Sequence, residues 1–176
     1  MTNRPSIIRN WRDVEYPGVP DSADADQAAA FANLSGEAGL VHLSAGHLRL
    51  PPGARSGPPA AMRDEEEFVF VLKGSPDLWA DGYLYRLKEG DGVGFPDRTG
   101  ISHTFINNTD KPVRLITVGE ASRQRSKCFY PLHPKRNKEI GEGLWKNPPK
   151  RKLGPHDGLS DLRRAELKKK KKRART

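Results

Sequence analysis

The sequence has few of the features that mark a secreted or membrane protein. It contains one cysteine, Cys128, so an intrachain disulfide is excluded and a reducing compartment is expected. No stretch approaches the roughly 20 apolar residues of a membrane-spanning helix, and no apolar segment of signal-peptide type follows the polar N-terminus. We therefore expect an intracellular protein, cytoplasmic or nuclear, without a membrane span.

Hydrophobic residues are also scarce, at 35% of 176, and aromatic residues make up 7%. This content suits one domain of ordinary size with polar tails. The first 120 residues contain 12 Lys and Arg against 17 Asp and Glu, whereas the last 56 contain 19 against 5. The net charge of +9 therefore belongs to the C-terminal part and is no evidence that the folded part binds nucleic acid.

The composition changes along the chain and predicts four parts. They are an N-terminal arm at 1–38, a barrel core at 39–120, an extension at 121–158 that straps the barrel, and a basic tail at 159–176. No internal repeat of fixed period is found. The extension is polar and Pro-rich with isolated aromatics, so it cannot build a core of its own.

Within the arm, two short elements are expected. Ile7–Trp11 is predicted to form a strand, with Trp11 anchored on the domain. Ser22 or Asp24 is predicted to cap a short helix leading into Ala28–Phe31.

From Gly39 onward the sequence indicates short strands every 8 to 12 residues, separated by Gly and Pro, which is typical of an all-β sandwich or barrel. The apolar parity switches at Ala45-Gly46, which indicates a bulge or bend there, and His47 and Arg49 are expected at the surface or at an interface. Phe68–Leu72 is predicted to be a strand buried on both faces. Asp81-Gly82 is a strong two-residue hairpin signal.

Two segments of this region resemble the paired motifs of the cupin superfamily. Glu67 is followed after six residues by Gly74, as at the end of the first motif. The second motif is matched, with two extra residues between its proline and its second glycine, by Gly90, Pro96, Gly100, His103 and Asn107. The middle of the chain also looks like uncharacterised single-domain cupins. The resemblance implies an all-β jelly-roll barrel with an irregular N-terminal arm and a basic, partly helical or disordered C-terminal tail.

The resemblance also implies where a metal would bind. Cupin metals usually sit on two histidines and the glutamate of the first motif and on the histidine of the second, and the latter two are Glu67 and His103 here. The two first-motif histidine positions fall on Ala60 and Met62, or one residue later on Ala61 and Arg63. Two ligands are too few for an ordinary site. We expect no cofactor, with a divalent Fe, Mn, Zn or Ni ion as the alternative.

Glu67 and His103 are the predicted catalytic pair. A histidine near neutral pKa beside a carboxylate can act as a general acid and base in enolisation, dehydration or ring closure. The alternative is that the two residues are relics held by hydrogen bonds to each other or to water. The side chains predicted to line the ligand pocket are His42, Met62, Tyr83, Tyr85, Phe95, Phe105 and Asn107.

The tail has a run of cations predicted to form a basic patch: Lys168, Lys169, Lys170, Lys171, Lys172 and Arg173. Leu159–Arg175 could be helical with Ser160 as N-cap, but five adjacent lysines repel one another, which favours disorder over the last ten residues. The run is a candidate nuclear localisation signal or a contact to nucleic acid or another acidic partner, although it has no aromatics for stacking on bases. A solvated tail is the alternative.

These observations leave three hypotheses for function. The first is a barrel that binds a small organic metabolite, with or without metal-independent isomerase, dehydratase or cyclase activity. The second is a non-catalytic ligand-sensing or interaction module addressed to nucleic acid or the nucleus by its tail. The third is a metal-dependent cupin oxygenase. The resemblance further implies a homodimer paired through sheet edges.

Overall fold

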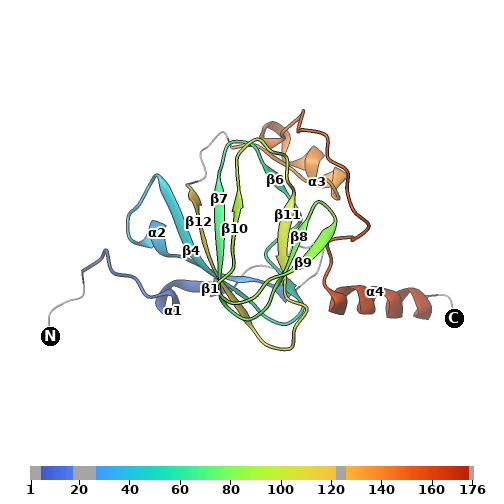
Figure 1. Cartoon of the computed structure of the whole chain (residues 1–176), viewed down its shortest axis with the longest axis horizontal. Coiled ribbons are helices and arrows are strands. Elements are labelled where there is room, and N and C mark those ends of the chain that lie inside the picture. Colours follow the sequence, from blue (N-terminus) through green and yellow to red (C-terminus); the bar gives the residue numbers. More distant parts are fainter. Residues whose placement is uncertain (1–4, 18–26, 122–125, 175–176) are drawn as a thin grey trace.

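The computed structural model describes residues 5–17, 27–121 and 126–174, and it is built on two antiparallel sheets that face each other (Figure 1). The six-stranded sheet contains, in spatial order, β1 (Glu15–Pro17), β3 (Ala30–Asn33), β4 (Leu43–Leu50), β12 (Val113–Glu120), β7 (Glu67–Lys73) and β10 (Gly92–Phe95). The five-stranded sheet contains β2 (Gln27–Ala28), β5 (Ala54–Arg55), β11 (His103–Ile106), β8 (Asp77–Ala80) and β9 (Tyr83–Arg86), with β2 joining in parallel. The predicted cupin-type jelly-roll barrel is confirmed.

The remaining elements are short, apart from the last helix. A third sheet pairs β6 (Ala61–Met62) with β13 (Cys128–Phe129). The helices are α1 (Trp11–Val14), α2 (Leu34–Glu37), α3 (Pro134–Glu139), the 3₁₀ turn η1 (Gly141–Gly143) and α4 (Asp161–Arg173). None of the described helices is long and apolar enough to span a membrane.

The hydrophobic core lies between the two large sheets. Its buried side chains come from both of them: Leu48, Leu50, Ala54, Val69, Val71, Leu78, Phe95, Phe105, Val113 and Leu115. Burying one Val or Leu side chain is worth about 1.5–3 kcal/mol, so this cluster is the main stabilising term of the barrel. The polar residues of the candidate site are therefore held by strands that the core already fixes.

The hairpin between β8 and β9 confirms the Asp81-Gly82 signal. Ala80 pairs with Tyr83 across a two-residue loop, and both loop residues have positive φ, at 46° for Asp81 and 89° for Gly82. A type I′ turn needs positive φ at both central positions, and Asp followed by Gly adopts them with little strain. Local turn chemistry alone was enough for this prediction.

The N-terminal arm differs from the prediction. Trp11–Val14 is a helical turn capped by the Asn10 side chain, so the strand expected at Ile7–Trp11 is wrong. Ala30–Asn33 is strand β3, which pairs with β4, so the helix expected into Ala28–Phe31 is wrong as well. Pairing with β4 outweighs the helix propensity of this Ala-rich segment, because tertiary contacts routinely override propensity. The proposed caps Ser22 and Asp24 lie outside the described residues.

The arm also explains why His47 is not at the surface. β4 pairs with β12 without a register shift from Leu43 to Leu50, so, of the bulge or bend expected at Ala45-Gly46, the bulge is absent from this strand. The outer face of β4 is instead covered by the arm: Trp11 stacks on the His47 ring, with centroids 4.3 Å apart. His47 is 1% exposed, so the prediction that it lies at the surface or at an interface is wrong: the arm of the same chain covers it.

Strand β7 is buried on one face only, which corrects a second prediction. Val69 and Val71 are buried, whereas Phe68, Phe70 and Leu72 are 47%, 36% and 44% exposed. A continuous apolar run is typical of a strand covered on both faces. In the described part of this chain, the outer face of β7 remains open.

The C-terminal tail is more ordered than predicted. Helix α4 runs to Arg173 with Ser160 as N-cap, so the cap is confirmed and the disorder expected over the lysine run is wrong for the described residues. In Figure 1, α4 projects away from the barrel.

Candidate functional site

The structure brings Glu67 and His103 together from opposite sheets. Glu67 is the first residue of β7 and His103 is the first residue of β11. Glu67 pairs with Phe95 on one side and Gly119 on the other, and His103 pairs with Ala80. Because the two sheets face each other, Glu67 Oε2 and His103 Nε2 lie 2.9 Å apart, which is hydrogen-bond distance.

The His103 ring is held in a fixed orientation. Phe95 stacks on it with centroids 3.5 Å apart and planes 6° apart, and Phe105 meets it edge to face. The His103 side chain is 11% exposed, whereas that of Glu67 is 33% exposed. Nδ1 of His103 is buried and has no hydrogen-bond partner among the described residues. A neutral ring here would donate Nε2–H to Glu67, which leaves Nδ1 as an unprotonated acceptor.

A cavity of about 500 Å³ adjoins this pair inside the barrel. Three hydroxyl side chains line it, Ser44, Ser56 and Thr117, together with the apolar rings of Phe31 and Phe105. The described residues that line the cavity include no Lys or Arg. Its polar groups are therefore hydroxyls and the acid–imidazole pair.

A second hollow, of about 440 Å³, lies beside Glu67. It is lined by the acids Glu66, Glu67 and Glu120 and by His42. His42, predicted as a pocket residue, thus contributes to this acidic hollow and not to the lining of the barrel cavity. Glu67 contacts both spaces.

Comparison with known proteins agrees with this architecture. The family model of the cupin domain matches residues 46–119, the segment that contains both halves of the site. A sugar phosphate isomerase of the cupin superfamily from Silicibacter pomeroyi shares 29% identity over 65% of this chain and 71% of its own, with a TM-score of 0.57. The cupin resemblance found in the motifs is therefore supported by both the sequence match and the fold.

Two further solved cupin-fold structures share the architecture alone. The first is a proposed sugar phosphate isomerase from Acidithiobacillus ferrooxidans, with 20% identity over 72% of this chain and 81% of its own and a TM-score of 0.62. The other is the polyketide cyclase RemF from Streptomyces resistomycificus, with 18% identity over 81% and 96% and a TM-score of 0.57. No curated protein matches the chain significantly.

The residues present do not fit the usual cupin metal. Ala60 lies opposite His103 in an isolated bridge, and Met62 lies on β6 opposite Cys128, so neither first-motif position offers a nitrogen ligand. Nε2 of His103 is already directed at Glu67. Among the described residues no three His, Cys, Asp or Glu side chains are grouped as a metal site would need. No chemical step is therefore assigned to a metal.

The other predicted pocket residues are distributed over several parts of the protein. Phe95 and Phe105 pack on His103. Tyr83 and Tyr85 are about half exposed on β9, at the outer edge of the five-stranded sheet, and they line neither of the two spaces described above. Asn107 is fully buried, and its side chain donates to the carbonyl oxygens of Leu50 and Lys111, which fixes the turn after β11.

The sequence-based reasoning missed the hydroxyl residues of the cavity. Ser56 Oγ accepts from the Phe105 backbone N–H and lies 3.0 Å from Thr104 Oγ1, so its orientation is set by β11. Ser44 of β4 pairs with Gly119 of β12, and Thr117 of β12 pairs with Gly46 of β4. The two-residue alternation of each strand could have placed them on one face, but only with the register known.

Proposed function

We propose that the barrel cavity binds a small uncharged organic molecule bearing a carbonyl and hydroxyl groups, and that Glu67 and His103 transfer a proton on it without a metal. The observation that carries this proposal is the 2.9 Å contact between Glu67 and His103 on the wall of a cavity of about 500 Å³. Cavities of this size hold metabolites and drug-sized molecules. Isomerisation, dehydration and ring closure at a carbonyl compound can each begin with removal of a proton from the carbon beside the carbonyl.

The surroundings of Glu67 and His103 suggest a different role for each residue. Glu67 is the more exposed side chain, so we assign it the removal of the proton from the substrate carbon. His103, stacked on Phe95, orients the carboxylate through Nε2. In an isomerisation, Glu67 then passes this proton to the former carbonyl carbon, while the proton of the neighbouring hydroxyl moves to the former carbonyl oxygen. In a dehydration, Glu67 passes it to the departing hydroxyl, which leaves as water, so that each turnover restores the starting state.

The cavity lining supports an uncharged ligand. A phosphate group is usually bound by Arg, by Lys or by a helix N-terminus. The described lining offers none of these, and it places a carboxylate, Glu67, where a phosphate would be repelled. The hydroxyl groups of Ser44, Ser56 and Thr117 suit hydroxyl or carbonyl oxygens instead.

The relatives support the reaction class at different strengths. The 29% identical structure from Silicibacter pomeroyi is a sugar phosphate isomerase, and sugar isomerisation is a proton transfer beside a carbonyl. We propose the same class of reaction for this protein, but on a substrate that carries no phosphate group. The polyketide cyclase is similar in fold alone and adds no argument on chemistry.

The proposal is tested by proton exchange in D₂O. The protein is incubated with neutral α-hydroxyketones and with their phosphate esters, and deuterium incorporation is followed by NMR. We expect exchange with a neutral compound, and Glu67→Gln to slow it by about 10²- to 10⁴-fold, the usual contribution of a positioned acid or base. His103→Ala should lower the rate in the same direction.

Glu66→Gln is the matched control, because Glu66 is the adjacent residue in sequence and lines the outer hollow but not the barrel cavity. Its exchange rate should equal that of the unmodified protein. Equal rates in Glu67→Gln and the unmodified protein would refute the pair as catalyst, and exchange confined to phosphate esters would refute the uncharged substrate.

A further inference from the structure

Helix α4 is the most strongly charged element of the described chain. Its 13 residues contain eight Lys and Arg and two Asp and Glu, and its last six residues are all cationic. Successive residues of an α-helix are 100° apart, so six of them carry positive charge to every side of the helix. Lys168–Arg173 are all exposed.

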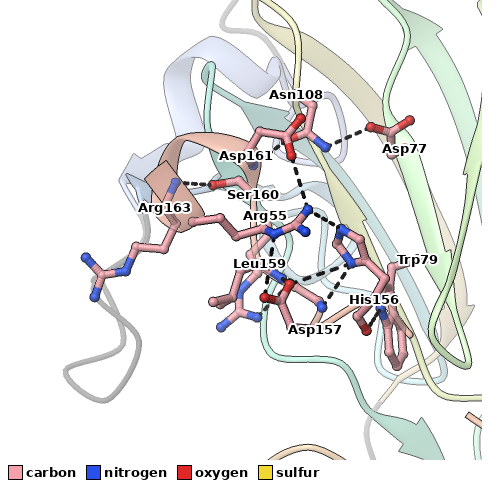
Figure 2. A network of polar contacts seen from close by, with 12 residues as sticks. Arg55, Asp77, Trp79, Asn108, His156, Asp157, Leu159, Ser160, Asp161 and Arg163 are labelled. Atoms are coloured by element: carbon pink, nitrogen blue, oxygen red, sulfur yellow. Dashed lines mark hydrogen bonds and ion pairs between the residues drawn. The ribbon is translucent and has the colours of Figure 1, made fainter. Parts of the chain in front are cut away.

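The start of this helix is tied to the barrel by a polar network, which Figure 2 shows. Arg55 of β5 is 4% exposed and donates through Nη1 to the Gly158 carbonyl at 3.0 Å. Trp79 of β8 donates through Nε1 to the His156 carbonyl at 2.9 Å. These two bonds fix the chain just before the helix.

The same network continues into the first turn of α4. The backbone N–H of Asp161 donates to Asn108 Oδ1 at 2.8 Å, and Asn108 Nδ2 donates to Asp77 Oδ2 at 2.8 Å. Ser160, 0% exposed, accepts from the Arg163 N–H as N-cap. The barrel therefore sets the direction of α4, and its cationic end is presented as a fixed projection.

We infer that this cationic end of α4 binds the phosphate backbone of double-stranded DNA without sequence preference. A helix of 10–12 Å diameter fits the major groove, which is about 12 Å wide and has phosphates along both walls. A helix charged on all sides can meet both walls at once. Against a flat anionic surface, such as a membrane, the lysines on the far side would remain in water.

The chemistry of the side chains excludes other modes of binding. The last six residues of α4 include no apolar or aromatic residue, so they have nothing to insert into a lipid layer or to stack on the bases of a single strand. Lysine lacks the fork of paired donors with which arginine reads guanine, and five of the six cations are lysines.

The position of the patch fits this partner as well. The first 120 residues have more acids than bases, 17 against 12, and would be repelled by phosphates. Because α4 points away from the barrel, its distal turns can enter a groove while the acidic barrel stays outside (Figure 1). The projection of α4 and the separation of its positive charge from the acidic barrel thus both favour a DNA duplex as the partner.

The test uses the whole 176-residue chain and a fluorescently labelled DNA duplex of about 20 base pairs with mixed sequence. Anisotropy titrations at 50 and 200 mM NaCl give the affinity and its salt dependence. If about five phosphates are contacted, counterion release predicts a loss on the order of 10²- to 10³-fold between these salt concentrations. Replacing Lys168, Lys169, Lys170 and Lys171 by Gln should abolish most of the binding and of its salt dependence.

A control of equal charge change replaces four exposed lysines outside α4 by Gln: Lys135, Lys138, Lys146 and Lys152. It should retain most of the affinity. Equal loss in both variants would show that net charge alone matters and would overturn the assignment to α4. Tighter binding to a single strand, or to vesicles with 30% phosphatidylserine, would overturn the duplex as the partner. The barrel reaction is untouched by any of these results.

Discussion

His47 and His103 have opposite surroundings. His103 faces the carboxylate of Glu67. His47 is enclosed by Trp11 and Arg114, whose guanidinium lies over the same indole, and neither of its ring nitrogens has a hydrogen-bond partner among the described residues. Burial, and then the charge of Arg114, lower the pKa of His47. Protonation of His47 therefore destabilises the packed arm.

The His47 environment predicts an acid-sensitive stability. An unfolded His47 titrates near pH 6.5, whereas the folded form binds its proton only at lower pH. Above about pH 6.5 the His47 ring is neutral in both states, so its titration does not change the free energy of unfolding. As the pH drops from 6.5 toward the lowered pKa, the unfolded state binds the proton first, and the free energy of unfolding falls. Urea unfolding at a series of pH values measures this, and His47→Phe should show a shallower decline toward acid.

Measurement at pH 8 is the control, because both proteins are uncharged at position 47 there and any difference reports packing against Trp11. Burial also lowers the pKa of His156, so part of the decline should persist in the His47→Phe protein. An identical pH dependence in the two proteins would contradict the role given to His47.

At the scale of elements, the C-terminal extension is bound to the barrel by its backbone. The Gly154 N–H donates to the Asp81 carbonyl at 2.7 Å, and the His156 N–H donates to the Gly82 carbonyl at 3.1 Å. The extension thus runs directly over the β8–β9 hairpin, and Arg151 adds an ion pair with Asp81. The approach is so close that a Cβ atom on Gly82 would lie 2.4 Å from the Gly154 backbone.

This crossing predicts a large effect for Gly82→Ala. The substitution adds strain at a φ of +89°, worth about 1–2 kcal/mol, and also forces the extension off the hairpin. Gly90→Ala is the matched control, with a φ of +91° and no heavy atom within 4 Å of the added Cβ. We expect Gly82→Ala to lower the free energy of unfolding by at least about 2 kcal/mol more than Gly90→Ala. If urea unfolding shows that Gly82→Ala and Gly90→Ala lower the free energy of unfolding equally, the close crossing is contradicted.

At the scale of the whole molecule, exposed apolar side chains gather on the outer face of one sheet. Phe68, Phe70 and Leu72 alternate along β7 with buried valines. Adjacent exposed apolar residues of this kind often mark an interaction site. The homodimer expected from the cupin resemblance stays a prediction, and this face is a better candidate for it than the sheet edges.

The dimer prediction is tested by sedimentation equilibrium. We expect a mass near twice 19.6 kDa at micromolar concentration, and Phe70→Lys should shift it toward 19.6 kDa because it places a charge in the apolar contact. Tyr85→Lys, on the exposed edge strand β9, serves as the comparison. A monomer in all three proteins would refute the dimer. If Tyr85→Lys alone dissociates the dimer, its interface lies at the sheet edge and not on the outer face of β7.

The sequence by itself determined the barrel, the Asp81-Gly82 hairpin, the Ser160 cap and the closeness of Glu67 to His103. Each depends on a short spacing or a local turn conformation that few residues control, or on a motif resemblance. The tertiary structure decided that His47 is buried, that β7 is open on its outer face and that the cavity has no cation in its described lining. Such properties depend on which distant segment covers each face, and side-chain alternation along one strand carries no information on that.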